Sequence, residues 1–168
     1  LERIRRAPRP GIAALLERAR VLPAAVDLET VSFALAPRLN AAGRVGEALE
    51  AARLLLSEDA TEAGAHADAL ETANLARRDL MKTAVAEARA IVADDPDAAA
   101  TLVHGPWGVG IVGLVAARLA EDRGRAAVVG AELGDVIRAS CRSDGTMDLG
   151  AALEQCGGNK AEAARLLG

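Results

Sequence analysis

The feature that most constrains this chain is a run of small apolar side chains that recurs at spacings of three and four between residues 57 and 92. This period predicts one long amphipathic helix, since residues three or four apart share a helix face. The apolar positions, with one gap, are Ala63, Ala67, Leu70, Ala73, Met81, Ala84, Ala88 and Ile91. Residues 57–60 resemble an N-cap followed by acids in the first turn, and Pro96 stands among aspartates after the run. We therefore expect a long helix over residues 58–95, with a domain boundary at 94–97.

The residues before this helix predict shorter helices. Apolar residues make up 51% of the chain and aromatic residues only 1%, so a core would consist mainly of Ala, Leu and Val. The expected helices cover residues 12–19, 31–36 and 46–56, with a proline turn at 8–11 before the first. Asp27 or Thr30 could cap the second helix, which is expected to stop before Pro37.

The residues after the boundary change to a strand-rich pattern. The expected order is strand, helix, strand, strand, helix, over residues 99–104, 111–121, 126–129 (continued by 131–133), 136–142 and 148–155. Arg123 and Gly124 are expected to end the helix, and Gly134 with Asp135 to form the hairpin turn. The fold class is therefore α/β (α+β): a mainly helical part with a long bridging helix, then a small mixed α/β domain.

Charge and cysteine content limit the classes of function. The net charge of −4 and the pI near 5.3 argue against a general basic coat for duplex DNA, although residues 1–20 hold six arginines against two glutamates. Cys141 and Cys156 make neither a disulfide framework nor a zinc pattern, which favours a reduced, cytoplasmic protein. Neither a signal peptide nor an apolar run of membrane-spanning length is visible, so no membrane partner is expected. The start at Leu1 and the end in an apparent helix suggest a piece of a larger protein.

Residues 37–44 are the first candidate for binding chemistry. Arg38, Asn40 and Arg44 are expected to lie in an irregular loop between helices, around Gly43. Guanidinium groups offer planar pairs of donors that fit phosphate oxygens, and a glycine lets the backbone approach a ligand closely. From the residues alone, a simple helix connection with solvated arginines is the alternative.

Residues 36–44, APRLNAAGR, resemble a signature of RecJ-type exonucleases, members of the DHH phosphoesterase superfamily. Other segments resemble the same family in the same order: residues 9–16, Asn74 with Arg77 and Arg78, residues 107–119 and residues 138–143. The resemblance extends over about residues 8–155. Relatives in the superfamily that cleave short oligonucleotides or cyclic dinucleotides are a rival, which residues 36–44 disfavour.

This resemblance implies a domain plan. Residues 1–57 would be the C-terminal part of a DHH catalytic domain, residues 58–95 the connecting helix, and residues 96–168 a partial, truncated DHH-associated domain with an atypical tail. In this family the DHH domain binds two Mn²⁺ or Mg²⁺ ions through Asp and His residues and hydrolyses single-stranded DNA from its 5′ end. The partner implied is single-stranded DNA; the oligomeric state stays open.

The resemblance also assigns roles to residues. Arg38 or Arg44 would hold a phosphate of the DNA, and Asn40 would support the loop. Ser140 and Arg142 would hold the 5′ end or the adjacent phosphate; strand alternation places these two on one face.

No metal ligands or catalytic residues are expected in this chain. Its two histidines, His66 and His104, are far apart in sequence, and no Asp-His-His triplet is present. We therefore expect that the Mn²⁺ or Mg²⁺ of the intact protein binds elsewhere, and that this chain alone has no nuclease activity.

Residues 108–113 have the form G-x-G-x-x-G, which offers a different function. The motif follows an expected strand, opens a helix, and is followed about twenty residues later by Glu132, as in dinucleotide-binding units. Only about seventy residues follow Pro96, too few for a full doubly wound sheet. The hairpin at Gly134 also argues for an antiparallel neighbour, so the glycines could simply allow tight helix–sheet packing.

The tail departs from the RecJ pattern. A Gly-Gly-His motif is expected near the end of the associated domain, whereas Gly157 and Gly158 are followed by Asn159. These three residues are therefore weak candidates for the DNA groove. Residues 152–168 resemble the start of a Fis-type helix-turn-helix, which leaves a non-catalytic DNA-binding or regulatory module as an alternative.

Overall fold

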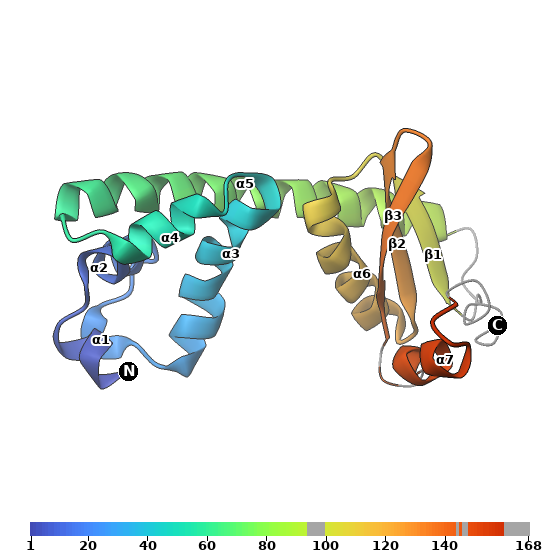
Figure 1. The fold of residues 1–168 in the computed structure, drawn as a ribbon, viewed down its shortest axis with the longest axis horizontal. Helices are drawn as coiled ribbons and strands as arrows, with labels where there is room; N and C mark the ends of the chain where they lie inside the picture. Colours follow the sequence, from blue (N-terminus) through green and yellow to red (C-terminus); the bar gives the residue numbers. More distant parts are fainter. Residues whose placement is uncertain (94–99, 144, 146–147, 160–168) are drawn as a thin grey trace. The chain divides into compact units, whose positions relative to one another are not determined.

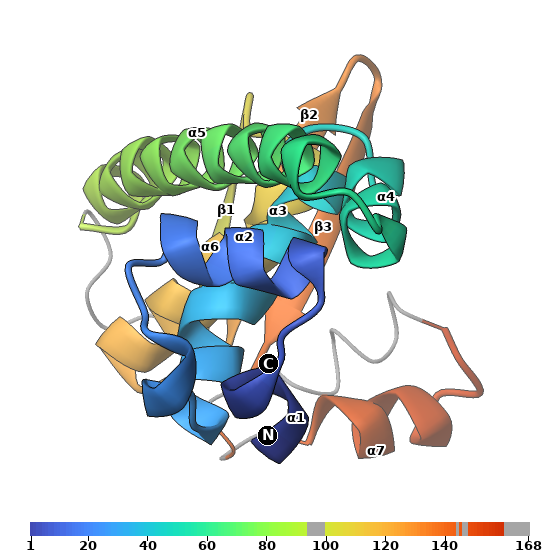
Figure 2. The same ribbon diagram turned by 90° about the vertical axis from the view of Figure 1, so that its left-hand side faces the viewer.

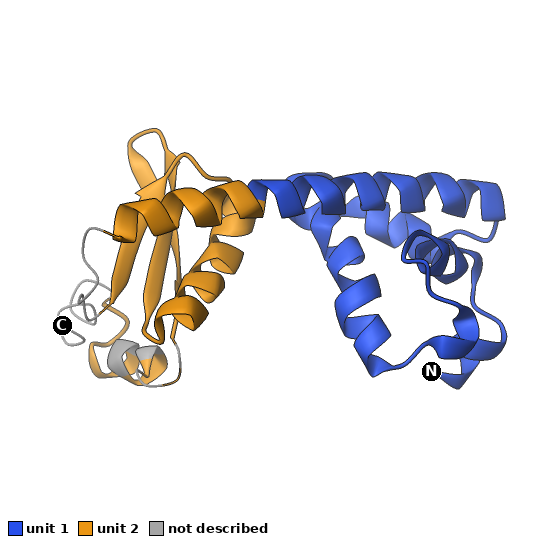
Figure 3. Ribbon diagram, turned by 180° about the vertical axis from the view of Figure 1, so that it is seen from behind, with its two compact units in different colours: residues 1–80 blue, residues 81–168 orange. Residues whose placement is uncertain are grey.

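The structure is a computed structural model that describes residues 1–93, 100–143, 145 and 148–159. The chain divides into two compact units, residues 1–80 and residues 81–168 (Figure 3). One 33-residue helix, α5 (Ala60–Val92), runs from the first unit into the second (Figure 1). The long helix is thus confirmed. The division into units falls inside this helix, and the domain boundaries expected at 57/58 and 95/96 stay predictions.

The cap of α5 differs from the expectation that Ser57 begins it. The backbone N–H of Glu62 donates to Asp59 Oδ1 at 2.8 Å, so Asp59 is the capping residue. Ser57 instead donates its hydroxyl to Glu62 Oε2 at 3.0 Å. The reason is that the helix starts at Ala60, and an N-cap side chain must stand directly before the first turn.

The first unit consists of helices. They are α1 (Glu2–Arg6), α2 (Pro10–Arg18), the 3₁₀ turn η1 (Pro23–Ala25), the π-helical segment η2 (Thr30–Leu35), α3 (Ala36–Val45), α4 (Leu49–Leu56) and the first part of α5. Figure 2 shows α2 and α4 beside the first half of α5. Asp27 accepts the backbone N–H of Thr30 at 2.7 Å, which confirms Asp27 as a cap.

The core of this unit is built from leucine and alanine, as the composition predicts. Its fully buried side chains include Leu15, Leu16, Val26, Leu54, Ala63, Ala67 and Leu70. Gly11 marks a close approach of two helices, because a Cβ at this position would lie 2.0 Å from the carbonyl oxygen of Leu54. Only glycine therefore allows α2 to approach α4 this closely.

The expectation of an irregular loop at residues 37–44 is wrong, because these residues form α3. Pro37 lies in the first turn of α3, where its missing N–H would have no partner within the helix. The π-helical segment η2 continues directly into that turn, so Pro37 does not separate the two helices. The proline turn expected at 8–11 is wrong in part for the same reason, since Pro10 is the first residue of α2.

The second unit is the small mixed domain that the sequence predicts. Besides the end of α5 it contains β1 (Thr101–Gly105), α6 (Val109–Arg123), β2 (Ala127–Leu133), β3 (Val136–Arg142) and α7 (Leu149–Gln155). β1 and β2 pair in parallel across the α6 crossover, and β2 and β3 pair antiparallel across the hairpin at Gly134, whose φ is +63°. Gly124, at φ +60°, ends α6 as expected. The α/β (α+β) class is thereby confirmed.

The α6 helix packs on one face of this sheet. Val103, Val129 and Ala131 point to that face and are buried, together with Val115 and Leu119 of α6. The pairing of Val129 with Ser140 places residues 138, 140 and 142 of β3 on the same face.

Within the second unit, polar contacts fasten the end of α5 to the residues that follow it. Trp107 is buried and donates its indole N–H to Glu87 at 2.7 Å. Arg89 pairs with Asp122 of α6. These contacts make Trp107 a packing anchor between α5 and the sheet domain.

Candidate nucleic-acid interface

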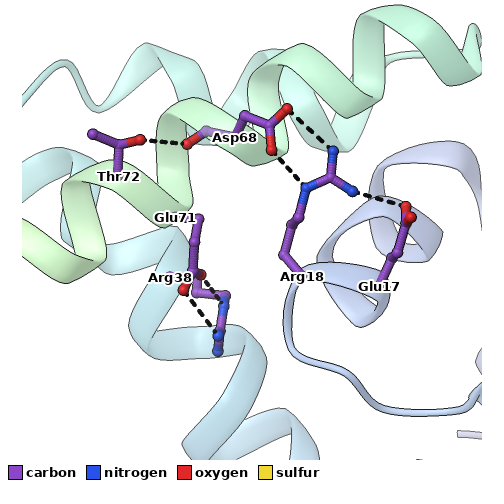
Figure 4. Close-up of polar contacts among 6 residues, drawn as sticks. All are labelled: Glu17, Arg18, Arg38, Asp68, Glu71 and Thr72. Carbon is purple, nitrogen blue, oxygen red and sulfur yellow. Dashed lines mark hydrogen bonds and ion pairs between the residues drawn. The ribbon is translucent and has the colours of Figure 1, made fainter.

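Arginines of the first unit cross to α5, and two of them end on carboxylates. Arg38 of α3 donates to both carboxylate oxygens of Glu71, at 2.5 and 3.3 Å, and also to the backbone oxygen of Ala34 (Figure 4). The side chains of Arg38 and Glu71 are 14% and 23% exposed. Since this pair is mostly buried and neutral, the Arg38 charge is already compensated within the unit.

A second pair of this kind joins α2 to α5. Arg18 donates to Asp68 through Nε at 2.6 Å and through Nη2 at 3.1 Å (Figure 4). The hydrogen bond to Asp68 raises the pKa of Arg18, and the same bond lowers the pKa of Asp68 below its ordinary value. Bidentate Arg–carboxylate contacts of this geometry fix the helices against each other.

The other two candidate residues of the APRLNAAGR stretch are exposed to solvent. Asn40 and Arg44 are exposed on α3, and Arg44 lies in its last turn. The two arginines therefore differ in burial, because Arg38 is mostly buried and Arg44 is exposed. The assignment of Arg38, Asn40 and Arg44 as phosphate ligands stays a prediction.

The helix α5 adds two polar residues that the sequence-based site did not include. Asn74 is 3% exposed, and its Oδ1 accepts a hydrogen bond from Arg77 Nη2 at 3.0 Å. The Nε of Arg77 is buried and has no hydrogen-bond partner in the part of the chain that the structure describes. Burial, then the nearby charges of Arg44 and Arg78, lower the pKa of Arg77. The sequence analysis names Asn74, Arg77 and Arg78 only as a segment that resembles the RecJ family, and it assigns them no role.

Ser140 and Arg142 of β3 come together as strand alternation predicts. Arg142 Nη1 donates to Ser140 Oγ at 3.2 Å and to the backbone oxygen of Cys141 at 2.7 Å. Arg142 is exposed and Ser140 partly buried. Within the described residues, no carboxylate pairs with Arg142. The pair therefore presents a hydroxyl and a positive charge side by side, and its role toward a 5′ end stays a prediction.

The glycine motif lies against this pair. A Cβ at Gly113 would lie 3.1 Å from Ser140 Oγ and 3.3 Å from Arg142 Nη2. The third glycine thus allows β3 side chains to approach α6, in agreement with the packing interpretation of the motif. Glu132, the acidic residue of the dinucleotide interpretation, pairs instead with His104 Nδ1 at 2.8 Å.

Gly157, Gly158 and Asn159 form a turn directly after α7. Both glycines have positive φ, +57° and +84°, and the N–H of Asn159 donates to the backbone oxygen of Cys156 at 2.9 Å. The left-handed backbone explains why glycine stands at these two positions. A role of this turn in a DNA groove stays a prediction.

Residues 1–93, 100–143, 145 and 148–159 contain no group of three or more His, Cys, Asp or Glu side chains that could hold a metal ion. His66 is bound to Glu50, with Nδ1 and Oε2 2.8 Å apart, and serves to join α4 to α5. The described helices also include none that is both long and apolar enough to cross a membrane.

Comparison with known proteins identifies the class of this fold. The single-stranded-DNA-specific exonuclease RecJ of Bacillus subtilis (strain 168) is 34% identical over 160 residues, which cover 93% of this chain and 20% of that protein. The crystal structure of RecJ from Thermus thermophilus in complex with Mg²⁺ matches with a TM-score of 0.80 at 30% identity, over 93% of this chain and 24% of that one. An exonuclease RecJ bound to manganese matches with a TM-score of 0.73 at 32% identity, over 91% of this chain and 38% of that one.

These matches show that the chain resembles part of the proteins named RecJ, over nearly all of its own length. It is a segment of the RecJ type in both sequence and fold, and it spans about a fifth to two fifths of the relatives it matches. The tail gives a separate match, because residues 149–168 fit the family model described as bacterial regulatory protein, Fis family. The similarity of the tail to a Fis-type segment is thus confirmed.

Proposed function

We propose that the protein to which this chain belongs is a 5′→3′ exonuclease specific for single-stranded DNA, and that this chain supplies contacts to the DNA backbone and the 5′ phosphate. The observation that carries this proposal is the fold match to RecJ, with a TM-score of 0.80 over 93% of the chain. We also propose that this protein acts in DNA repair and recombination, in the cytoplasm.

The chemistry of the site fits a phosphodiester backbone. In the second unit, Arg142 supplies a charged fork and Ser140 a hydroxyl next to it, 3.2 Å away. Both lie beside Gly113, in the second turn of α6, so the positive end of that helix adds to the local field. In the first unit, Arg44 is exposed, and so is Asn40 about one turn before it. Such groups bind phosphate without reading bases.

Divalent metal ions would supply the hydrolytic chemistry in the intact protein. The RecJ structures that match contain Mg²⁺ or manganese. A bound metal ion of this kind activates water and stabilises charge on phosphate oxygens. The described residues of this chain do not fit such an ion, so its ligands would lie in the rest of the protein.

Because the metal ligands would lie outside this chain, we predict that the chain alone does not cut DNA. We expect no loss of a labelled single strand when the purified chain is incubated with Mn²⁺ or Mg²⁺, measured by denaturing gel electrophoresis. Full-length RecJ is the positive control. Robust, chelator-sensitive degradation by the chain would show that it holds a metal centre of its own.

The DNA contact is tested by binding rather than cleavage. We expect the chain to bind a 5′-phosphorylated oligothymidylate, and Arg142→Gln to weaken that binding about tenfold, or ~1.4 kcal/mol, the size of one charge-assisted hydrogen bond. Fluorescence anisotropy with 5′-phosphate and 5′-hydroxyl strands measures both the affinity and the preference for the phosphate.

Arg118→Gln is the matched control, because Arg118 is an exposed arginine of the same unit that pairs with Glu121 and Asp122. Equal losses in both variants would indicate a general charge effect and would count against a specific site at Ser140 and Arg142.

A second function is favoured by the Fis-family match at residues 149–168. We propose, as the rival, that the tail belongs to a helix-turn-helix that binds duplex DNA in the major groove. The same anisotropy experiment with duplex DNA separates the two. Preference for the duplex, lost on deletion of residues 149–168, would support the rival; preference for the single strand supports the exonuclease.

A further inference from the structure

We propose that Asn74 and Arg77 of α5, together with Arg44 of α3, form a phosphate-binding site in the first unit that holds the backbone of a single-stranded nucleic acid. This inference rests on the proposed function and adds to it two residues on the long helix.

The first observation is a contrast between Arg77, which belongs to α5, and two arginines that contact α5 from other helices. Arg18 and Arg38 each meet a carboxylate of α5, Asp68 and Glu71, through two nitrogen atoms. Arg77 meets only a neutral amide, that of Asn74, at 3.0 Å. Its charge is therefore not compensated by any carboxylate among the described residues, whereas the charges of the other two are.

The second observation is an unused donor. Arg77 Nε is buried and unpaired in the described part of the chain, although a guanidinium N–H ordinarily finds an acceptor when it leaves water. An unsatisfied polar atom in a native structure calls for an explanation such as a missing ligand. Nε and one Nη of the same guanidinium form the fork that donates to two oxygens of a phosphate.

The third observation is the surrounding charge. Arg44 and Arg78 lie close enough to Arg77 that their repulsion adds to burial in lowering its pKa. An anion placed among these three groups would relieve the repulsion and satisfy the Nε donor together. A phosphodiester has two oxygens that share one negative charge, so it could both offset the repulsion and accept the Nε hydrogen bond.

Asn74 is the positioning residue of this site. It is almost fully buried, and its Oδ1 holds Nη2 of Arg77, so it fixes the guanidinium plane from the inner side. A buried side chain, rather than a flexible surface contact, therefore sets the orientation of the Arg77 guanidinium. Backbone binding fits this design, since the site offers charge and a planar fork but no group to read bases.

The test compares variants of the full chain for binding to a labelled oligothymidylate over a series of salt concentrations. We expect Arg77→Gln to weaken binding about tenfold and to lower the slope of log affinity against log salt by about 0.7, the value for one phosphate contact on a single strand. Arg77→Lys keeps the charge without the fork and should fall between the wild type and Arg77→Gln.

Thermal unfolding separates a binding role from a structural one. Because Arg77→Gln removes a buried unpaired donor and a like-charge repulsion, we expect its melting temperature to be unchanged or raised. Arg53→Gln is the control, since Arg53 is a half-exposed arginine of the same unit that pairs with Glu50; it should leave affinity and salt slope unaltered.

The outcomes distinguish this inference from the proposed function. Unchanged affinity and salt slope in Arg77→Gln, with weakened binding in Arg142→Gln, would overturn the site on α5 and leave the exonuclease assignment intact. No binding by the wild type would overturn both. Inorganic phosphate serves as the second probe: stabilisation of the wild type by phosphate that Arg77→Gln loses, without any DNA binding, would make this a free-anion site and would refute the nucleic-acid assignment.

Discussion

Two arginines of the first unit and one of the second have different kinds of partner. In the first unit, Arg18 and Arg38 reach across to α5 and end on carboxylates. In the second unit, Arg142 stays on its own strand and donates to the hydroxyl of Ser140 and to a carbonyl. An arginine that meets a carboxylate fastens two elements, whereas one that meets neutral acceptors keeps its charge available for an anion.

Arg77 shows that the distinction depends on the partner and not on the unit. It lies in the first unit, but its contact is an amide, like the neutral contacts of Arg142. The comparison therefore gives a rule for arginines with a known partner. A carboxylate partner marks the scaffold, as at Arg18 and Arg38, and a neutral partner marks a candidate binding surface, as at Arg77.

The largest effect expected is on the scaffold of the first unit. Gly11→Ala would place a methyl group 2.0 Å from the carbonyl oxygen of Leu54, and backbone cannot yield as a side chain can. We expect a loss of about 3 kcal/mol in the free energy of unfolding, at the upper end of overpacking effects. Chemical denaturation measures the change.

Gly64→Ala is the matched control for that substitution. Gly64 lies inside α5, and its Cβ would come no closer than 3.9 Å to Arg18, so the change should stabilise by about 0.5–1 kcal/mol through helix propensity. If both variants had the same stability, the close approach of α2 and α4 would be refuted.

A smaller effect is expected from breaking one arginine pair. Glu71→Gln leaves Arg38 mostly buried without its counter-charge, and we expect a loss of about 1–2 kcal/mol in unfolding free energy.

The same variant sharpens the comparison, because it frees Arg38 and should strengthen binding to single-stranded DNA about threefold. Ser140→Ala, which removes no ion pair, should change stability by less than about 0.5 kcal/mol. An unaltered or weaker DNA affinity in Glu71→Gln would contradict the rule.

The smallest expected effect is the change in folding stability at acidic pH. Hydrogen bonds lower the pKa of Asp27, Glu50 and Asp68 below their ordinary values of 3.8, 4.5 and 3.8, with Thr30, His66 and Arg18 as the leading partners. Because the folded pKa is depressed, each carboxylate contributes stability above its ordinary value, and that contribution disappears as the pH falls through the lower folded value.

All three carboxylates belong to the first unit, so the first unit should lose stability first as the pH falls through and below the ordinary pKa range of these groups. Thermal melts followed by near-UV and far-UV circular dichroism at several pH values would measure this, with Glu50→Gln as the control that flattens the curve. The signal of Trp107 reports the second unit. If this signal were lost at the same pH as the helical signal, the prediction that the first unit loses stability first would be contradicted.

Several local elements of this chain follow from its sequence alone. The repeat of three and four predicts α5, Gly124 predicts the end of α6, and Gly134 predicts the hairpin, as the structure confirms. Each depends on neighbours within a few residues, through helix periodicity or a left-handed backbone angle. The pairing of Ser140 with Arg142 belongs to the same group, because alternation along one strand decides it.

Tertiary contacts decided the rest. Pro37 and the residues after it look like a loop in isolation, yet η2 runs straight into α3 and places Arg38 against Glu71, thirty-three residues away. The unpaired Nε of Arg77 and the contact of Gly113 with β3 are likewise invisible in the sequence. The physical reason is that the partner and the burial of a charged side chain depend on segments distant in the chain, whereas helix period and turn geometry depend only on nearby residues.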